Sequence, residues 1–204
     1  MAEPTAIARS PIAPAPPVTV ENGWEVSARR SAAALRITDC TPLAKILLLG
    51  PEDEALGVPF GRAERDEKGV LVVGSGPGEW TLFGAPGTGG RLWGPAAAAL
   101  SPAEGAVFDV THARAAIRTT GPETVALLAK VCAIDLAEDI TPDGAAFRSS
   151  VAKVVTDVVR DDRGGQRSYL LHCDRALGGY LFDALLDAGA EFDIEVDGFA
   201  GPGI

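Results

Sequence analysis

The sequence predicts an α+β protein in which two ferredoxin-like units, each a split βαβ arrangement, pack together behind an extended N-terminal arm. Three observations lead to this prediction: a proline-rich start, apolar stripes of helical period in the second half, and β-rich runs between them. We expect the arm at residues 1–30 and the first α+β unit at 31–103. The second unit, with the order βαββαβ, is expected at 104–204.

The arm is inferred from residues 11–17, where prolines are concentrated. Proline has no N–H to donate and favours the extended polyproline conformation, so this run is unsuited to a regular hydrogen-bonded ladder. Such an arm becomes ordered when it lies across a partner subunit, at an entropic cost to the affinity.

The first unit contains short β-rich runs that glycine and proline separate. Strands are expected at 35–38, 45–49, 70–73 and 79–83, followed by a helix at 91–100 and a strand at 107–110. The glycine-rich run 74–78 lies between two of these strands. We therefore interpret it as a strand-turn-strand connection.

The second unit starts with a strand at 115–118 and a helix that begins near Pro122. Proline followed by the acidic Glu123 suits the first turn of a helix. The helix then has one apolar stripe, formed by Val125, Leu127, Leu128, Val131 and Cys132. This stripe predicts packing against a sheet.

The valine-rich run 149–160 and the run 168–173 are expected to form a hairpin around the Asp-Gly-rich turn 161–165. Asp174 is suited to cap the helix that follows, which we expect to extend to residue 188. Its apolar stripe consists of Leu177, Leu181, Leu185 and Ala188. A last strand is expected at 192–196.

Acidic residues outnumber basic ones by 28 to 18, which gives a formal net charge of −10. The basic residues are scattered, so nucleic acid is an unsuitable partner. The longest apolar runs are too short to cross a bilayer, and the sequence shows no secretory signal. We expect a soluble cytoplasmic protein.

The three cysteines, Cys40, Cys132 and Cys173, are widely spaced and odd in number. This pattern fits neither a disulfide framework nor a zinc site, and it agrees with a reducing compartment. Cys132 lies on an apolar helical stripe and is expected to be a buried hydrophobe. No residue near Cys40 in the sequence would lower the pKa of its thiol.

Two histidines are the remaining candidates for acid-base chemistry. His112 follows Asp109 closely, so a carboxylate could orient it as a general base, although a local bond to the backbone is the commoner outcome. His172 and Cys173 are neighbours on a strand, so they point to opposite faces and cannot act together. We expect one in the core and one at the surface.

Neither glycine-rich run fits a nucleotide site. A dinucleotide fingerprint needs a helix after its glycines, whereas a strand is expected after residue 78, and the run 87–90 is interpreted as a flexible loop. Trp24, Trp80 and Trp93 either fill the core of their own unit, the favoured interpretation, or anchor a partner. The sequence therefore predicts no catalytic, cofactor-binding or metal-binding residue in this chain.

Six segments, in this order and spacing, resemble the γ subunit of heterotetrameric sarcosine oxidase. They are Arg9-Ser10-Pro11-Ile12, Gly76-Pro77-Gly78-Glu79-Trp80-Thr81-Leu82, Val107-Phe108-Asp109-Val110-Thr111-His112-Ala113-Arg114, Leu127-Leu128-Ala129-Lys130-Val131-Cys132-Ala133-Ile134-Asp135-Leu136, Thr141-Pro142-Asp143-Gly144 and Asp174-Arg175-Ala176-Leu177-Gly178-Gly179-Tyr180-Leu181. The resemblance covers nearly the whole chain. It implies a fold related to the folate-binding domains of the aminomethyltransferase group.

The resemblance also implies a non-catalytic accessory subunit that has no cofactor of its own. Its partners would be α, β and δ subunits that carry FAD, FMN, NAD, tetrahydrofolate and zinc. The complex would oxidatively demethylate sarcosine or a related N-methyl amine and pass the one-carbon unit to tetrahydrofolate. Two alternatives stay open: a stand-alone folate-binding or one-carbon-transfer protein of the same fold superfamily, and a structural adaptor in an unrelated assembly.

Overall fold

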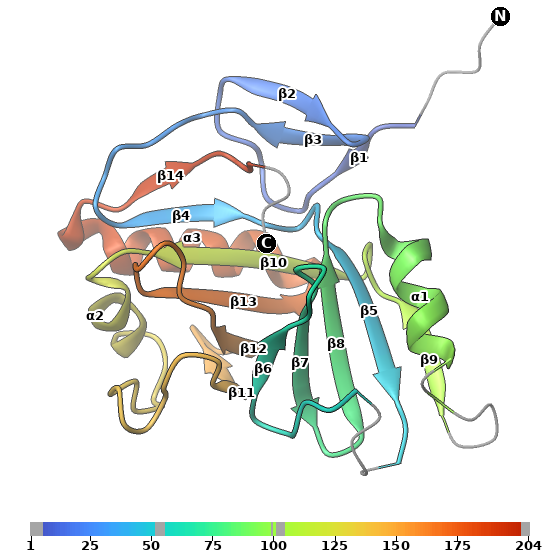
Figure 1. The fold of residues 1–204 in the computed structure, drawn as a ribbon. Helices are drawn as coiled ribbons and strands as arrows, with labels where there is room; N and C mark the ends of the chain where they lie inside the picture. Colours follow the sequence, from blue (N-terminus) through green and yellow to red (C-terminus); the bar gives the residue numbers. More distant parts are fainter. Residues whose placement is uncertain (1–5, 52–55, 99, 101–104, 201–204) are drawn as a thin grey trace, which may run out of the picture.

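The computed structural model describes residues 6–51, 56–98, 100 and 105–200. The chain forms three sheets and three α-helices over these residues (Figure 1). In chain order the elements are β1 (Ala8–Arg9), β2 (Val18–Glu21), β3 (Trp24–Ser27), β4 (Arg36–Asp39), β5 (Ala44–Leu49), β6 (Ala63–Arg65), β7 (Leu71–Gly76), β8 (Glu79–Gly84), α1 (Gly89–Ala98), β9 (Ala106–Asp109), β10 (Arg114–Thr120), α2 (Thr124–Ala129), β11 (Ala146–Val151), β12 (Val154–Arg160), β13 (Ser168–Asp174), α3 (Gly178–Gly189) and β14 (Glu195–Asp197).

The largest sheet has six strands in the order β11-β12-β13-β10-β4-β14. All neighbours are antiparallel except β4 and β14, which run parallel. The expected strand at residues 149–160 is two strands, because Ala152 and Lys153 adopt positive φ angles and turn the chain back within the valine-rich run. The expected hairpin around 161–165 is confirmed as β12 and β13.

The second sheet has five antiparallel strands in the order β6-β7-β8-β5-β9. The expected hairpin around the glycine run 74–78 is confirmed as β7 and β8. Gly89 and Gly90 are the first residues of α1 and do not belong to a loop as expected. A helix start tolerates glycine because the first N–H groups of a helix have no partner within it.

The predicted N-terminal arm is a third, small sheet in the order β1-β3-β2. Asn22 and Gly23 form the β2–β3 turn with positive φ angles of 48° and 79°, as a type I′ hairpin requires. The sheet lies beside β14 and β4 (Figure 1). The proline run is therefore followed by regular structure, with Trp24 and Val26 buried against the body of the protein.

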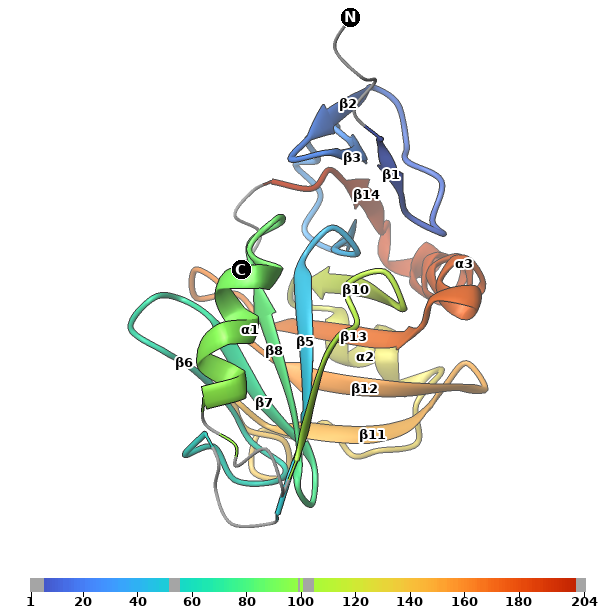
Figure 2. The same ribbon diagram turned by 90° about the vertical axis from the view of Figure 1, so that its right-hand side faces the viewer.

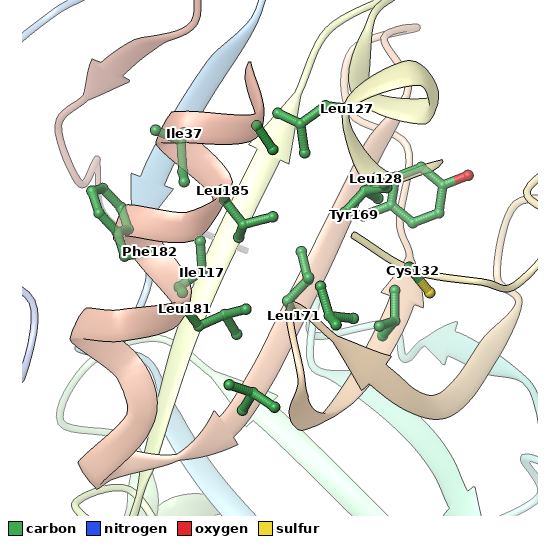
Figure 3. Close-up of a cluster of buried hydrophobic side chains, with 14 of the residues drawn as sticks. Ile37, Ile117, Leu127, Leu128, Cys132, Tyr169, Leu171, Leu181, Phe182 and Leu185 are labelled. Carbon is green, nitrogen blue, oxygen red and sulfur yellow. The ribbon is translucent and has the colours of Figure 1, made fainter. Parts of the chain in front are cut away.

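The two large sheets stack with helices on their outer sides, so the molecule has four layers (Figure 2). α2 and α3 cover one face of the six-stranded sheet, where Leu127 and Leu185 meet Ile117 and Leu171 (Figure 3). A second cluster fills the space between the sheets, and a third lies under α1. The six-stranded sheet is thus buried on both faces over most of its width.

The strands of the two large sheets are interleaved along the sequence. β4, which precedes the five-stranded sheet in the chain, lies between β10 and β14 of the six-stranded sheet, and β9 is one of the two edge strands of the five-stranded sheet. A ferredoxin-like unit would pair the strands at the positions of β10 and β14 directly, so neither sheet is such a unit on its own. The predicted boundary at residue 103 lies outside the described residues. The architecture is α+β, rich in sheet with few helices.

Candidate functional site: an arginine-lined pocket

An open pocket of about 320 Å³ lies on the six-stranded sheet, on the face that the five-stranded sheet covers elsewhere. We call it the arginine pocket, because three of the residues that line it are arginines. Its lining comprises Arg36, Thr38, Cys40, Arg118, Thr120, Arg163, Gln166, Asp197, Gly198, Phe199 and Ala200.

Strand register brings the first of these residues together. Arg118 on β10 pairs with Thr38 on β4, and Thr120 pairs with Arg36. Thr38 in turn pairs with Asp197 on β14. Because alternate residues of a strand share a face, Arg36, Thr38 and Arg118 all point to the pocket side.

Asp161, just after β12, gathers three arginines, of which Arg118 and Arg163 line the pocket. Its Oδ2 accepts hydrogen bonds from Arg118 Nη2 at 2.7 Å, Arg65 Nη2 at 2.7 Å and Arg163 Nε at 3.0 Å. Arg118 Nη1 also donates to Ser168 Oγ at 2.8 Å. One carboxylate therefore holds three guanidinium groups in place.

Arg36 stands on the opposite side of the pocket. Its Nη2 donates to Gln166 Oε1 at 2.7 Å, and its Nε is 3.9 Å from Asp197 Oδ2. Gln166 belongs to the hairpin turn between β12 and β13, where it pairs with Arg163. The turn thus fixes Arg36 and Arg163 relative to each other.

Three guanidinium groups surround the single carboxylate of Asp161, so positive charge is in excess in this cluster. Burial raises the pKa of Asp161, but the charges of Arg118, Arg163 and Arg65 lower it below its ordinary value, so the carboxylate stays ionised. Burial and the neighbouring Arg118 charge lower the pKa of Arg163. Even so, arginine stays protonated at neutral pH, so positive charge is concentrated here.

Cys40 lies in the wall of the pocket and is buried. Burial raises the pKa of its thiol to about 11, with the Arg118 charge acting in the opposite direction. At neutral pH the sulfur is a thiol and a poor nucleophile. It contributes an apolar surface to the pocket and no reactivity.

The sequence did not identify this pocket, although it contained one signal. Arg118 ends the expected strand 115–118, whose other residues are apolar, and alternation places it on the same face as Ala116. A charged residue on a strand that is buried on both faces needs a partner. That partner, Asp161, lies 43 residues away in the sequence.

Asp109 and His112 do not form a hydrogen-bonded pair within the described residues. Asp109 Oδ1 accepts from the Thr111 N–H at 2.9 Å, which is the local backbone bond that such a position favours. His112 is exposed and stacks on the buried Trp24, with ring centroids 4.9 Å apart and planes 12° apart. His112 thus covers the indole of the N-terminal sheet.

His172 and Cys173 are both buried, so the expectation that one would lie at the surface is wrong. The reason is that both faces of the sheet are covered: Cys173 faces the helices, and His172 faces the five-stranded sheet, where it meets Phe83 edge-on. Cys132 is buried in the helix-side cluster, as expected.

Burial lowers the pKa of His172 to about 4, although the charge of Asp157 opposes the shift. Arg114, Lys45 and Arg148 also face the ring and lower its pKa further. Its Nδ1 and Nε2 have no hydrogen-bond partner among the described residues. The imidazole is therefore neutral at physiological pH.

His172 should make the protein less stable in acid. The unfolded chain binds the proton near the ordinary pKa of about 6.5, whereas the folded chain binds it only near 4. The contribution of neutral His172 is therefore full above about pH 6.5 and is lost as the pH falls towards 4, by up to about 3 kcal/mol. The measurement is urea unfolding of the wild type and of His172→Leu across this range. Equal pH slopes for the two proteins would contradict the prediction.

Lys45 is a fully buried lysine on β5, in a run of sequence that indicated only a strand. Its Nζ donates to the carbonyl oxygens of Thr41 at 2.7 Å, Leu43 at 2.8 Å and Thr111 at 3.3 Å. Burial lowers its pKa to about 7, and the charge of Asp39 opposes that shift. The side chain joins the loops before β5 and after β9.

Two of the tryptophans lie in the core, and one is at the surface. Trp24 and Trp80 are buried, and Trp80 Nε1 donates to the Val58 carbonyl at 2.8 Å. Trp93 on α1 is 46% exposed. Across the part of the chain that the structure describes, no three His, Cys, Asp or Glu side chains gather as a metal site, and no helix is long and apolar enough to span a bilayer.

No protein-family model matches the sequence, and no curated protein matches it. Solved structures do share its fold. A chain of the heterotetrameric sarcosine oxidase from Corynebacterium sp. U-96, in complex with pyrrole 2-carboxylate, superposes with a TM-score of 0.68 at 21% identity. The match covers 81% of this chain and 89% of that one, so the two are similar in length.

The glycine cleavage system aminomethyltransferase T from Bartonella henselae superposes with a TM-score of 0.69 at 15% identity. This match covers 91% of the present chain and 56% of the aminomethyltransferase, so the chain spans about half the length of that enzyme. The protein therefore has the α+β fold that this sarcosine oxidase chain and this aminomethyltransferase share.

Proposed function

We propose that this chain is a non-catalytic accessory subunit of a sarcosine oxidase-like complex that demethylates sarcosine or a related N-methyl amine and passes the one-carbon unit to tetrahydrofolate. The observation that carries the proposal is the likeness in fold to one chain of a heterotetrameric sarcosine oxidase, over 81% of this chain and 89% of that one. Chains of similar length and fold suit the same place in an assembly. The aminomethyltransferase is much longer, which makes it a weaker guide to the whole protein.

The chemistry of the described residues supports an accessory role. The thiols of Cys40 and Cys173 have pKa values that burial raises to about 11, and His172 is buried and neutral. These groups are poorly suited to nucleophilic or acid-base work at neutral pH. The flavins FAD and FMN, and also NAD, tetrahydrofolate and zinc, are assigned to partners equivalent to α, β and δ subunits.

Co-purification with partner subunits tests this proposal. The tagged chain, purified from an extract of its host, should co-purify with larger subunits. The recovered complex should show flavin absorbance and should form peroxide when sarcosine is added. A permanent subunit should bury roughly 2,000 Å² or more on its partners. An extract from an untagged strain is the control. Recovery of a stable monomer without flavin-containing partners would contradict the proposal.

A stand-alone folate-binding or one-carbon-transfer protein is the second candidate. It is favoured by the likeness to an aminomethyltransferase over 91% of this chain. Titration of the chain with a reduced folate separates the two candidates. Saturable binding at micromolar concentration, without co-purifying subunits, would favour the second.

A further inference from the structure

We propose that the arginine pocket binds a small organic anion through a carboxylate or phosphate group. The pocket carries an excess of positive charge. Arg36, Arg118 and Arg163 line it together with one carboxylate, that of Asp197. Asp161 pairs with Arg118 and Arg163, so one positive charge among these residues is left in excess. The chain as a whole has a net charge of −10, so this cluster is a local reversal of sign. An anion in the pocket would neutralise the excess.

Two arginines of the pocket have unused hydrogen-bond donors. Arg118 is 7% exposed, and its Nε has no partner among the described residues. Arg163 Nη2 is likewise buried without a partner in that part of the chain. Buried donors are almost always satisfied, by protein, water or ligand. Both residues line the pocket, so a ligand there lies next to the two guanidinium groups that carry these unused N–H groups.

The guanidinium groups of the pocket suit an anion with paired oxygens. Guanidinium groups are planar forks that match the paired oxygens of carboxylate and phosphate. Asp161 and the hairpin turn hold Arg118 and Arg163 in position, so little side-chain entropy is lost on binding. The preorganised groups favour a compact anion.

The size and lining of the pocket suit a small ligand. A volume of about 320 Å³ lies at the small end of the range for ligand sites. Cys40 and Phe199 provide an apolar wall, and the side chains of Thr38 and Thr120 line the floor. The ligand class is therefore a small acid with an apolar body, either a carboxylic acid or a phosphate ester.

The test is calorimetric titration of the full-length chain, or of the complex in which it is recovered, with inorganic phosphate and separately with glutarate at low ionic strength. At least one anion should bind with a Kd of about 1 mM or tighter, and added salt should weaken the binding. Tighter binding of phosphate would identify a phosphate ester as the ligand class, and tighter binding of glutarate a carboxylic acid.

Arg36→Gln and Arg163→Gln should each weaken binding by about tenfold. Both side chains are partly exposed, so the variants should fold, and circular dichroism checks this. Arg91→Gln is the matched control, because Arg91 is an exposed arginine on α1 far from the pocket lining. Absence of saturable binding to either anion, or equal affinity in the wild type and both pocket variants, would overturn the proposal. The result does not depend on whether the chain joins an amine-oxidising complex.

Discussion

Replacing Asp161 with asparagine is expected to lower the free energy of unfolding by about 3–5 kcal/mol. The carboxylate is the shared partner of Arg65, Arg118 and Arg163, at distances of 2.7, 2.7 and 3.0 Å. Without it, the buried Arg118 keeps its charge but loses its counter-ion. An unpaired buried charge is among the most destabilising changes that a single substitution can make.

Urea unfolding at neutral pH measures this loss. The matched control is Asp183→Asn, because Asp183 is an exposed aspartate on α3, and its cost should stay within about 0.5 kcal/mol. Adding Arg118→Met to Asp161→Asn should recover part of the stability by removing the unpaired charge. A cost below about 1 kcal/mol for Asp161→Asn would show that the cluster does not depend on its carboxylate.

The same carboxylate should contribute to acid sensitivity. Its folded pKa lies below the unfolded value, so its stabilising effect is full above the unfolded pKa of about 3.8 and is lost as the pH falls through the folded pKa. This window lies below the one expected for His172, which begins near pH 6.5. The free energy of unfolding, measured by urea unfolding at a series of pH values, should therefore fall in two separable pH ranges.

Replacing Phe83 with alanine is the second change with a large expected effect, about 3–5 kcal/mol. Phe83 on β8 is 0% exposed and belongs to the cluster between the two large sheets. Its ring meets the edge of His172 on β13, with centroids 5.1 Å apart. Truncation leaves a cavity where the sheets stack, and neighbours on two sheets cannot both relax to fill it.

Phe108→Ala is the matched control for this prediction. Phe108 belongs to the same five-stranded sheet, on the edge strand β9, and is 48% exposed. Its truncation should cost well under 1 kcal/mol in the isolated chain, because most of its surface is not packed. Equal losses for the two phenylalanines in urea unfolding would mean that the space between the sheets is not a tight core.

Local sequence patterns predicted many of the helices and strands but fewer of their exact boundaries. The apolar stripe at Leu181, Leu185 and Ala188 is buried in α3, as expected. Leu177, expected in the same stripe, is instead 43% exposed and lies in a 3₁₀ turn before α3. Asp174 caps this turn by accepting from the Ala176 N–H at 2.8 Å. The helix expected through Cys132 ends at Ala129, because Cys132 instead pairs with Val151 on β11. The helix is therefore shorter than its apolar pattern predicted, because the last residue of the pattern takes part in a tertiary strand pairing.

The N-terminal segment was predicted only as an extended arm, because its prolines were the stronger local pattern and the two-residue hairpin turn after them was the weaker one. Asn22-Gly23 between Val18–Glu21 and Trp24–Ser27 is a typical two-residue hairpin turn. The hairpin alone would be marginal in water. It is stable here because Trp24 and Val26 bury their side chains against the body of the protein, which no local pattern reveals.

By itself, the sequence determined the α+β class, the β12–β13 hairpin and the two helices of the second half. These properties depend on periods of 2 and 3.6 residues, which act over short stretches of chain. Only the tertiary structure decided that β4 inserts between β10 and β14, and that Asp161 meets Arg118 and Arg65. The physical reason is that strand neighbours and buried charge pairs are chosen by packing between distant segments. The arginine pocket exists only where that packing brings its residues together.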